Sequence, residues 1–200
     1  SQVQFTVRLP EPLPAGEVLA LSVVDEVTGL ALNAVDYQMT SVDTITYTAT
    51  LPIPDQAVIK YRYIRRGATV VIEDTNTDTP IRYRIVHISG PMQIVDTVNS
   101  WSDHPVNTLS GNIYGTVINS DTSAPVPGIM VTAGGVQTLT DSGGRFALIG
   151  LRGGTHNLVA YALDGSFQTF QQGATVAENQ GTPVQITMRP AQLVNIIFTV

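Results

Sequence analysis

The sequence lacks cysteine altogether and contains a single lysine, Lys60, among its 200 residues. The absence of cysteine excludes disulfides, thiol catalysis and cysteine-bound metals. Charged residues make up only 13% of the chain, and 10 basic against 16 acidic side chains give a formal net charge of −6. Nucleic acids and anionic membranes are therefore not expected as partners, because binding phosphate requires clustered, uncompensated Lys and Arg. No apolar run approaches the roughly 20 residues of a membrane span.

Valine, isoleucine and threonine are abundant instead. Together they number 64 residues, almost a third of the chain, and such a composition favours strands over helices. The hydrophobic content of 43% is too high for a disordered chain. The sequence begins at Ser1 with neither a methionine nor a signal peptide, from which we expect a mature or excised part of a longer protein.

Strand signals recur along the whole chain, and no segment shows sustained helical periodicity. In residues 44–51, Ile45, Tyr47, Ala49 and Leu51 alternate with four threonines, which predicts one buried and one solvated face. Further strands are predicted at 3–9, 18–24, 58–65, 68–73, 81–88, 93–98, 111–118, 129–133, 136–140, 145–151, 156–162, 167–171 and 184–189. We predict an all-β protein of two tandem β-sandwich domains, prealbumin-like or immunoglobulin-like.

The boundary between the two domains is placed near residue 104. Residues 100–108 are polar, include Pro105 and lack alternation, as a linker would. Residues 1–104 hold 12 acidic and 7 basic side chains, whereas residues 105–200 hold 4 and 3. Near the end, Phe198-Thr199-Val200 repeats the opening 5–7. Residues 193–200 are thus either a closing strand of the second domain or the first strand of a following module.

The second half resembles the carboxypeptidase regulatory-like domains, which are small transthyretin-like sandwiches common in bacterial surface and secreted proteins. The residues that carry this resemblance are 113–117, 124–132, 140–146 and 151–158. The resemblance implies a non-catalytic accessory or spacer domain. Independently of it, Asp141 to Gly144 is predicted to close a hairpin, after which Phe146 points inward.

The first half resembles, more loosely, the starch-binding family of carbohydrate-binding modules, through residues 3–9, 51–65 and 95–101. That family holds glucan largely on two exposed tryptophans. Here residues 25–30 and 70–73 stand in the two regions, and Trp101 is the only tryptophan of the chain. The resemblance therefore implies a scaffold with Trp101 in its core or rim, and it transfers no sugar-binding residue.

Basic residues gather in the first half and offer one candidate binding surface. Alternation places Lys60 and Arg62 on one face of their strand, and Arg82 and Arg84 on one face of theirs. If the two strands share a sheet, a basic stripe forms that could bind an anionic glycan or an acidic neighbouring domain. The alternative is that these side chains pair with acidic residues on neighbouring strands.

A candidate metal loop is formed by Asp74, Asn76 and Asp78, whose oxygens alternate as at the start of a calcium loop. The sixth position of such a loop should be glycine and is Thr79, and the twelfth should be glutamate and is Ile85. A solvated hairpin loop is therefore favoured, and no metal is predicted.

Catalytic patterns are weak. Asp141-Ser142-Gly143 matches the short aspartic-protease signature, but it occurs once and in a glycine-rich turn. His87, His104 and His156 show no zinc spacing.

We predict non-enzymatic accessory, spacer and interaction modules of a larger secreted or cell-surface bacterial protein, without a cofactor. Polysaccharide or neighbouring domains of the same chain are the expected partners. The alternative is an alpha-glucan-like carbohydrate-binding module of an extracellular polysaccharide-active protein, which would bind through Tyr37 or loop tyrosines.

Overall fold

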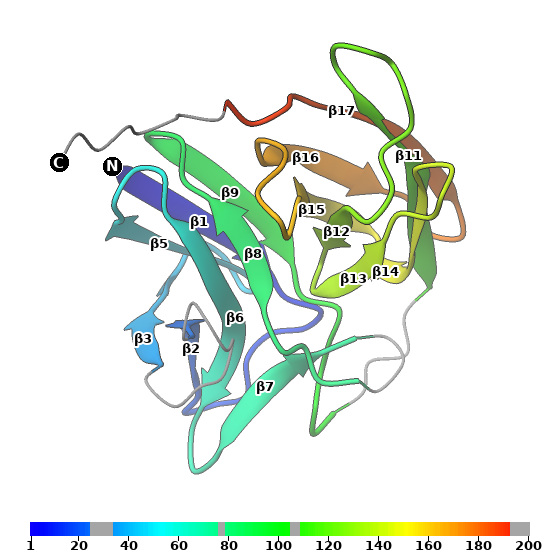
Figure 1. The fold of residues 1–200 in the computed structure, drawn as a ribbon. Coiled ribbons are helices and arrows are strands. Elements are labelled where there is room, and N and C mark those ends of the chain that lie inside the picture. The colour runs from blue at the N-terminus through cyan, green and yellow to red at the C-terminus, as the bar shows by residue number, and fades with distance from the viewer. Residues whose placement is uncertain (25–33, 76–78, 105–108, 193–200) are drawn as a thin grey trace, which may run out of the picture.

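All regular elements in the described part of the chain are β-strands (Figure 1). The computed structural model describes residues 1–24, 34–75, 79–104 and 109–192. The prediction of an all-β fold is confirmed. Among the described residues, no helix is long and apolar enough to cross a membrane.

The first half, residues 1–104, forms two sheets. One has the strand order β4-β5-β1-β9, and the other has the order β10-β7-β6-β2-β3. β8 pairs with residues 58–61 of β6, whereas β7 pairs with residues 64–66 of the same strand. Phe5, Leu19 and Tyr63 belong to the buried core of this half. The strands are β1 (Gln2–Arg8), β2 (Val18–Val23), β3 (Val35–Gln38), β4 (Thr40–Ser41), β5 (Thr46–Pro52), β6 (Val58–Arg66), β7 (Val70–Asp74), β8 (Arg84–His87), β9 (Met92–Thr97) and β10 (Ser100–Trp101).

The second half, residues 105–200, forms two smaller sheets with the strand orders β14-β11-β17 and β13-β12-β15-β16. Its separate core includes Ile113, Leu148 and Leu158, all fully buried. The strands are β11 (Ser110–Asn119), β12 (Met130–Ala133), β13 (Val136–Leu139), β14 (Arg145–Arg152), β15 (Gly154–Tyr161), β16 (Phe170–Val176) and β17 (Gly181–Met188).

The alternating strand at 44–51 and the turn at Asp141 are both present in the structure. Ile45, Tyr47 and Ala49 pack against the first core, as alternation predicts. The Asp141 carboxylate accepts hydrogen bonds at 2.8 Å from the backbone N–H of Gly143 and of Arg145. These bonds tighten the predicted turn. The turn does not close a hairpin, however, because β13 and β14 on either side of it belong to different sheets, so this part of the prediction is wrong.

Other boundaries differ from the prediction. The predicted strand at 81–88 is regular only in β8, and that at 167–171 begins later, as β16. The predicted linker starts inside the first half, because Ser100 and Trp101 form β10 against β7. Trp101 is 1% exposed, and the guanidinium carbon of Arg65 lies 4.9 Å from its ring centre. Residues 105–108 of the linker lie outside the described residues.

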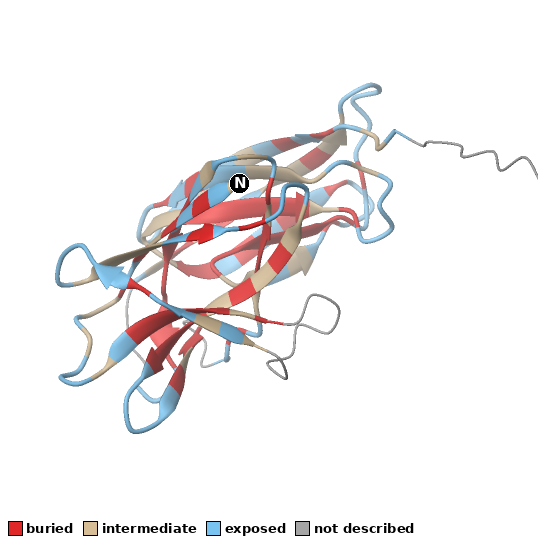
Figure 2. Ribbon diagram, turned by 90° about the vertical axis from the view of Figure 1, so that its left-hand side faces the viewer, coloured by how far each residue is buried: buried red, intermediate tan, exposed pale blue. Residues whose placement is uncertain are grey.

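The sheet that contains β15 is covered on both faces (Figure 1). Leu158 and Ala160 point into the second core. Val159, which lies between them in the sequence, packs instead with Ile85 of β8. Because a layer of the protein covers each face, β15 shows no alternation and is buried at almost every residue. Figure 2 shows such continuously buried strands in the interior. The two cores lie on either side of residue 104, and the division into two domains stays a prediction.

Candidate functional site

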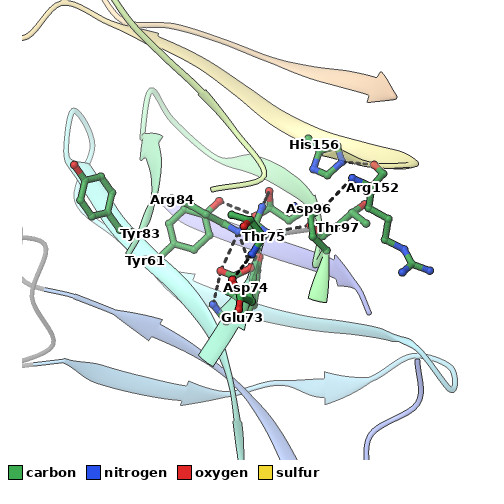
Figure 3. Close-up of polar contacts among 12 residues, drawn as sticks. Tyr61, Glu73, Asp74, Thr75, Tyr83, Arg84, Asp96, Thr97, Arg152 and His156 are labelled. Atoms are coloured by element: carbon green, nitrogen blue, oxygen red, sulfur yellow. Dashed lines mark hydrogen bonds and ion pairs between the residues drawn. The ribbon is translucent and has the colours of Figure 1, made fainter. Parts of the chain in front are cut away.

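A buried polar cluster links the two sheets of the first half (Figure 3). Arg84 of β8 is 3% exposed. Its Nη2 lies 2.7 Å from Glu73 Oε2 on β7, and its Nη1 lies 3.2 Å from Asp96 Oδ1 on β9. Nη2 also donates to the carbonyl of Thr97 at 2.9 Å. Three buried charges are tolerated together because each is paired and hydrogen-bonded.

Two tyrosines complete this cluster. The hydroxyls of Tyr61 and Tyr63 donate to Asp96 Oδ2 at 2.7 and 2.9 Å. Burial raises the pKa of both tyrosines well above its ordinary value, and the negative charge of Asp96 raises it further. Burial by itself lowers the pKa of Arg84, but Glu73 and Asp96 more than offset this and raise it well above normal. The two hydroxyls and the guanidinium therefore stay protonated at neutral pH, and all five side chains are buried.

From this cluster, polar contacts continue into the second half. We call the contact region between the two halves the seam. The Thr97 hydroxyl donates to the carbonyl of Thr155 at 2.9 Å. The Arg152 N–H donates to Asn99 Oδ1 at 3.0 Å, and the Asn157 amide donates to the carbonyl of Ile85 at 3.3 Å.

An apolar patch lies in the same seam. Its buried members are Ile85, Met130 and Val159, and its partly buried members are Val58, Tyr83 and Tyr161. Both halves contribute to the patch. The seam therefore combines hydrophobic contact with directional hydrogen bonds between the two halves.

His156 lies at the edge of the second core, close to the seam. It is fully buried, and its Nε2 donates to the carbonyl of Arg152 at 2.8 Å. Its Nδ1 has no hydrogen-bond partner among the described residues. Burial lowers the pKa of His156 from 6.5 to about 4. The imidazole is therefore neutral at neutral pH.

The predicted basic stripe does not form. The strands do share a sheet, because Lys60 pairs with Ile85 and Tyr61 pairs with Arg84. Arg84 faces the first core with Tyr61, so it lies on the opposite face from Lys60. The interpretation in which cations pair with local acids is correct for Arg84.

The remaining basic candidates lie nearer the surface. Lys60 Nζ is 5.0 Å from the centre of the Tyr83 ring, and the guanidinium carbon of Arg82 is 6.0 Å from it. Arg62 is half-buried, and burial lowers its pKa. A binding role for Lys60, Arg62 and Arg82 stays a prediction.

Tyr37 lies on β3, at the edge of its sheet, and is 38% exposed. A sugar-binding role for it also stays a prediction. Asp74 ends β7 and is buried, and its Oδ1 accepts from the N–H of Thr75 at 2.7 Å. Asn76 and Asp78 lie outside the described residues. Within the described ranges, no group of three or more His, Asp or Glu side chains could hold a metal ion.

Sequence reasoning missed most of the residues that line two cavities along the seam, although Lys60, a predicted candidate, lines one of them. Tyr83 and Tyr161 line one, Phe167 lines the other, and Gln56 lines both. A signal existed for Tyr83, because it alternates with Arg84 and so had to lie on the opposite face. No signal existed for Gln56, whose position depends on contacts across the seam.

Comparison with known proteins supports one of the two resemblances. Residues 112–189 match the carboxypeptidase regulatory-like domain family. The predicted resemblance of the second half is therefore confirmed. The starch-binding resemblance of the first half stays a prediction. No curated protein matches the sequence.

Several solved structures follow a loosely similar course. The chain is similar to GBS52, the minor pilin of the Gram-positive pathogen Streptococcus agalactiae, with 14% identity, a TM-score of 0.39, and 98% of this chain and 99% of that chain covered. It is also similar to the shaft pilin SpaA of Lactobacillus rhamnosus GG, with 10% identity and a TM-score of 0.32, and the match covers 98% of this chain and 99% of that chain. The Bacillus anthracis TIE protein has 12% identity and a TM-score of 0.34, and the match covers 94% of this chain but only 34% of that chain. TM-scores below 0.5 mark only a loose likeness.

Proposed function

We propose that this chain is a non-enzymatic pair of β-sandwich domains, divided near residue 104, that serves as a spacer and interaction module. In this proposal it belongs to a larger secreted or cell-surface bacterial protein. The match of residues 112–189 to the carboxypeptidase regulatory-like family supports an accessory role for the second half. The solvent-sealed state of Arg84, Glu73 and Asp96 supports a structural role for the largest polar cluster.

The observation that carries the proposal is the double coverage of the sheet β13-β12-β15-β16. A spacer keeps the parts of the protein on either side of it at a fixed separation. Two domains joined by a flexible linker would not do so. Here Val159 packs against Ile85, and Thr97 is hydrogen-bonded to Thr155 across the same seam. The two halves therefore behave as one stiff unit.

The lack of cysteine makes this stiffness measurable with spin labels. Val42 in the first half and Ile149 in the second are 64% and 67% exposed, so both accept a labelled cysteine without entering a core. Double electron–electron resonance on a Val42→Cys and Ile149→Cys variant should give one narrow distance distribution. A Val42→Cys and Val70→Cys pair, within the first half, provides the reference width. A distribution much broader than this reference would overturn the proposal.

We also propose that residues 193–200 open a following module. Aligning Phe198 with Phe5 places Ile196 and Val200 at the positions of Val3 and Val7. Val3, Phe5 and Val7 are all fully buried in β1. The end of the chain therefore repeats the core-facing positions of the opening strand as well as its letters.

A further inference from the structure

Two cavities open side by side along the seam and share Gln56. The larger, of about 550 Å³, is lined by His87, Phe167, Gln168 and Gln171 among others. The smaller, of about 470 Å³, lies between Tyr83 and Tyr161. Both volumes fall within the range of about 300–1,000 Å³ that is typical of ligand pockets. Each cavity takes walls from both halves, so neither half forms this groove alone.

The groove combines aromatic rings with neutral amides. One face of Tyr83 is covered by Lys60, whereas Phe167 and Tyr161 are only partly buried. Gln56 and Gln168 are exposed within the groove. Although the chain has 16 acidic residues, none of the described residues that line the two cavities is acidic.

Gln56 has an unusual backbone conformation at the point where the two cavities meet. Its φ is +65°, in the left-handed region that side chains other than glycine rarely adopt. Its N–H donates to the carbonyl of Ile88 at 2.6 Å, which holds the residue in this conformation. Gln56 is the third residue of the turn 54–57, in which the Ala57 N–H faces the carbonyl of Pro54 at 3.4 Å, and this turn accounts for the positive φ. The turn places Gln56 where the two cavities meet.

We propose that this groove binds a linear oligosaccharide, with sugar rings against Tyr161 and Phe167 and sugar hydroxyls bonded to Gln56 and Gln168. The apolar face of a pyranose packs on an aromatic ring. A glutamine amide offers both donors and an acceptor, which matches neighbouring hydroxyls. The proposal goes beyond the spacer role and does not depend on it, because a flexible pair of domains could also close on a glycan.

A peptide strand is the competing occupant. An extended peptide is usually recognised by backbone groups on a free strand edge. β16 stands at the end of its sheet and β8 pairs only with β6 among the described strands, so strand edges are present at the groove as well. The exposed amides of Gln56 and Gln168, beside the rings of Tyr161 and Phe167, favour a sugar.

The test uses the full chain and three probes, namely maltohexaose, cellohexaose and hexagalacturonate. Titrations followed by amide resonances in NMR should show saturable shifts for at least one of them. Gln56→Gly removes the amide but keeps the left-handed backbone, so it should weaken binding at least fivefold without lowering the melting temperature. Gln168→Ala should have a similar effect on binding.

Two controls lie outside the groove. Gln172→Ala changes an exposed glutamine on the same strand as Gln171, and Tyr114→Ala removes a tyrosine that is 48% exposed on β11. Both should bind the probe as the parent chain does. The proposal is wrong if no probe binds at millimolar concentration, or if Gln56→Gly and Gln168→Ala bind unchanged. Saturable shifts at the same residues with an extended peptide but with none of the sugars would also overturn it.

Discussion

Gly135, in the turn between β12 and β13, lies against Ile81 of the first half so closely that a β-carbon would stand 2.5 Å from Ile81 Cγ2. Ile81 is 1% exposed, and three of its side-chain carbons would lie within 2.8 Å of the added β-carbon. The glycine is thus needed for the approach of the two halves as well as for the turn. The sequence alone indicates only the turn.

Gly135→Ala should therefore lower the free energy of unfolding by about 2–4 kcal/mol, through backbone strain together with overpacking. Gly128→Ala is a matched control, because φ is +73° there and +79° at Gly135, but nothing lies within 4 Å of its added β-carbon. The control should lose only about 1–2 kcal/mol. Urea denaturation measures both. Equal losses would show that Ile81 gives way and that the contact is not tight.

Arg84→Met should lower the free energy of unfolding by about 3–5 kcal/mol, because Glu73 and Asp96 would remain buried without their cation. Arg66→Met is the control. Arg66 also pairs with a carboxylate, Asp36, but its side chain is 50% exposed. Its loss should cost less than about 1 kcal/mol. Urea denaturation at pH 7 distinguishes the two, and similar losses in both variants would contradict the structural role of the cluster.

Acid should destabilise the protein through His156. Its pKa is about 4 in the folded state and 6.5 ordinarily. Between these values the unfolded chain binds more protons than the folded one, so stability falls as the pH drops from 6.5 towards 4. The loss is about 1.4 kcal/mol per pH unit and about 3 kcal/mol in all.

His156→Gln keeps a donor for the carbonyl of Arg152 and removes the titration. Denaturation at pH 7, 5.5 and 4.5 should show the parent chain losing stability relative to this variant. The charges that act on His156 are Arg84, which lowers its pKa, and Asp96, which raises it. A parent and a His156→Gln variant with parallel pH profiles would contradict the prediction.

Removing residues 193–200 separates the two interpretations of the final segment. If it opens a following module, a chain that ends at residue 192 should unfold at the same urea concentration as the parent chain. A closing strand of the second domain would instead bury apolar side chains, each worth about 1.5–3 kcal/mol. A drop of several kcal/mol on truncation would therefore reject the following module.

Strands were predicted correctly where apolar and polar residues alternate strongly. They were missed where a segment becomes a strand only through pairing with residues distant in the sequence. Residues 44–51 alternate cleanly, and Ile45, Tyr47 and Ala49 pack as predicted. β3 was missed, because three of its four residues, Val35 among them, are exposed and show no apolar face. β10 was taken for a linker, because its burial depends on β7 and on Arg65, both distant in sequence.

The all-β class, the turn at Asp141 and the resemblance of residues 112–189 could all be inferred from the amino-acid sequence, because they depend on local alternation, turn chemistry and residue order. The partner that covers each face of β8 and of β15, in contrast, becomes known only from the folded structure. Alternation correctly separated Arg84 from Tyr83 and Ile85, but it implied that the arginine faced solvent. Glu73 and Asp96 bury the arginine, and the second half covers the apolar face. A strand covered on both sides has no solvated face, so its own residues cannot reveal what lies against each.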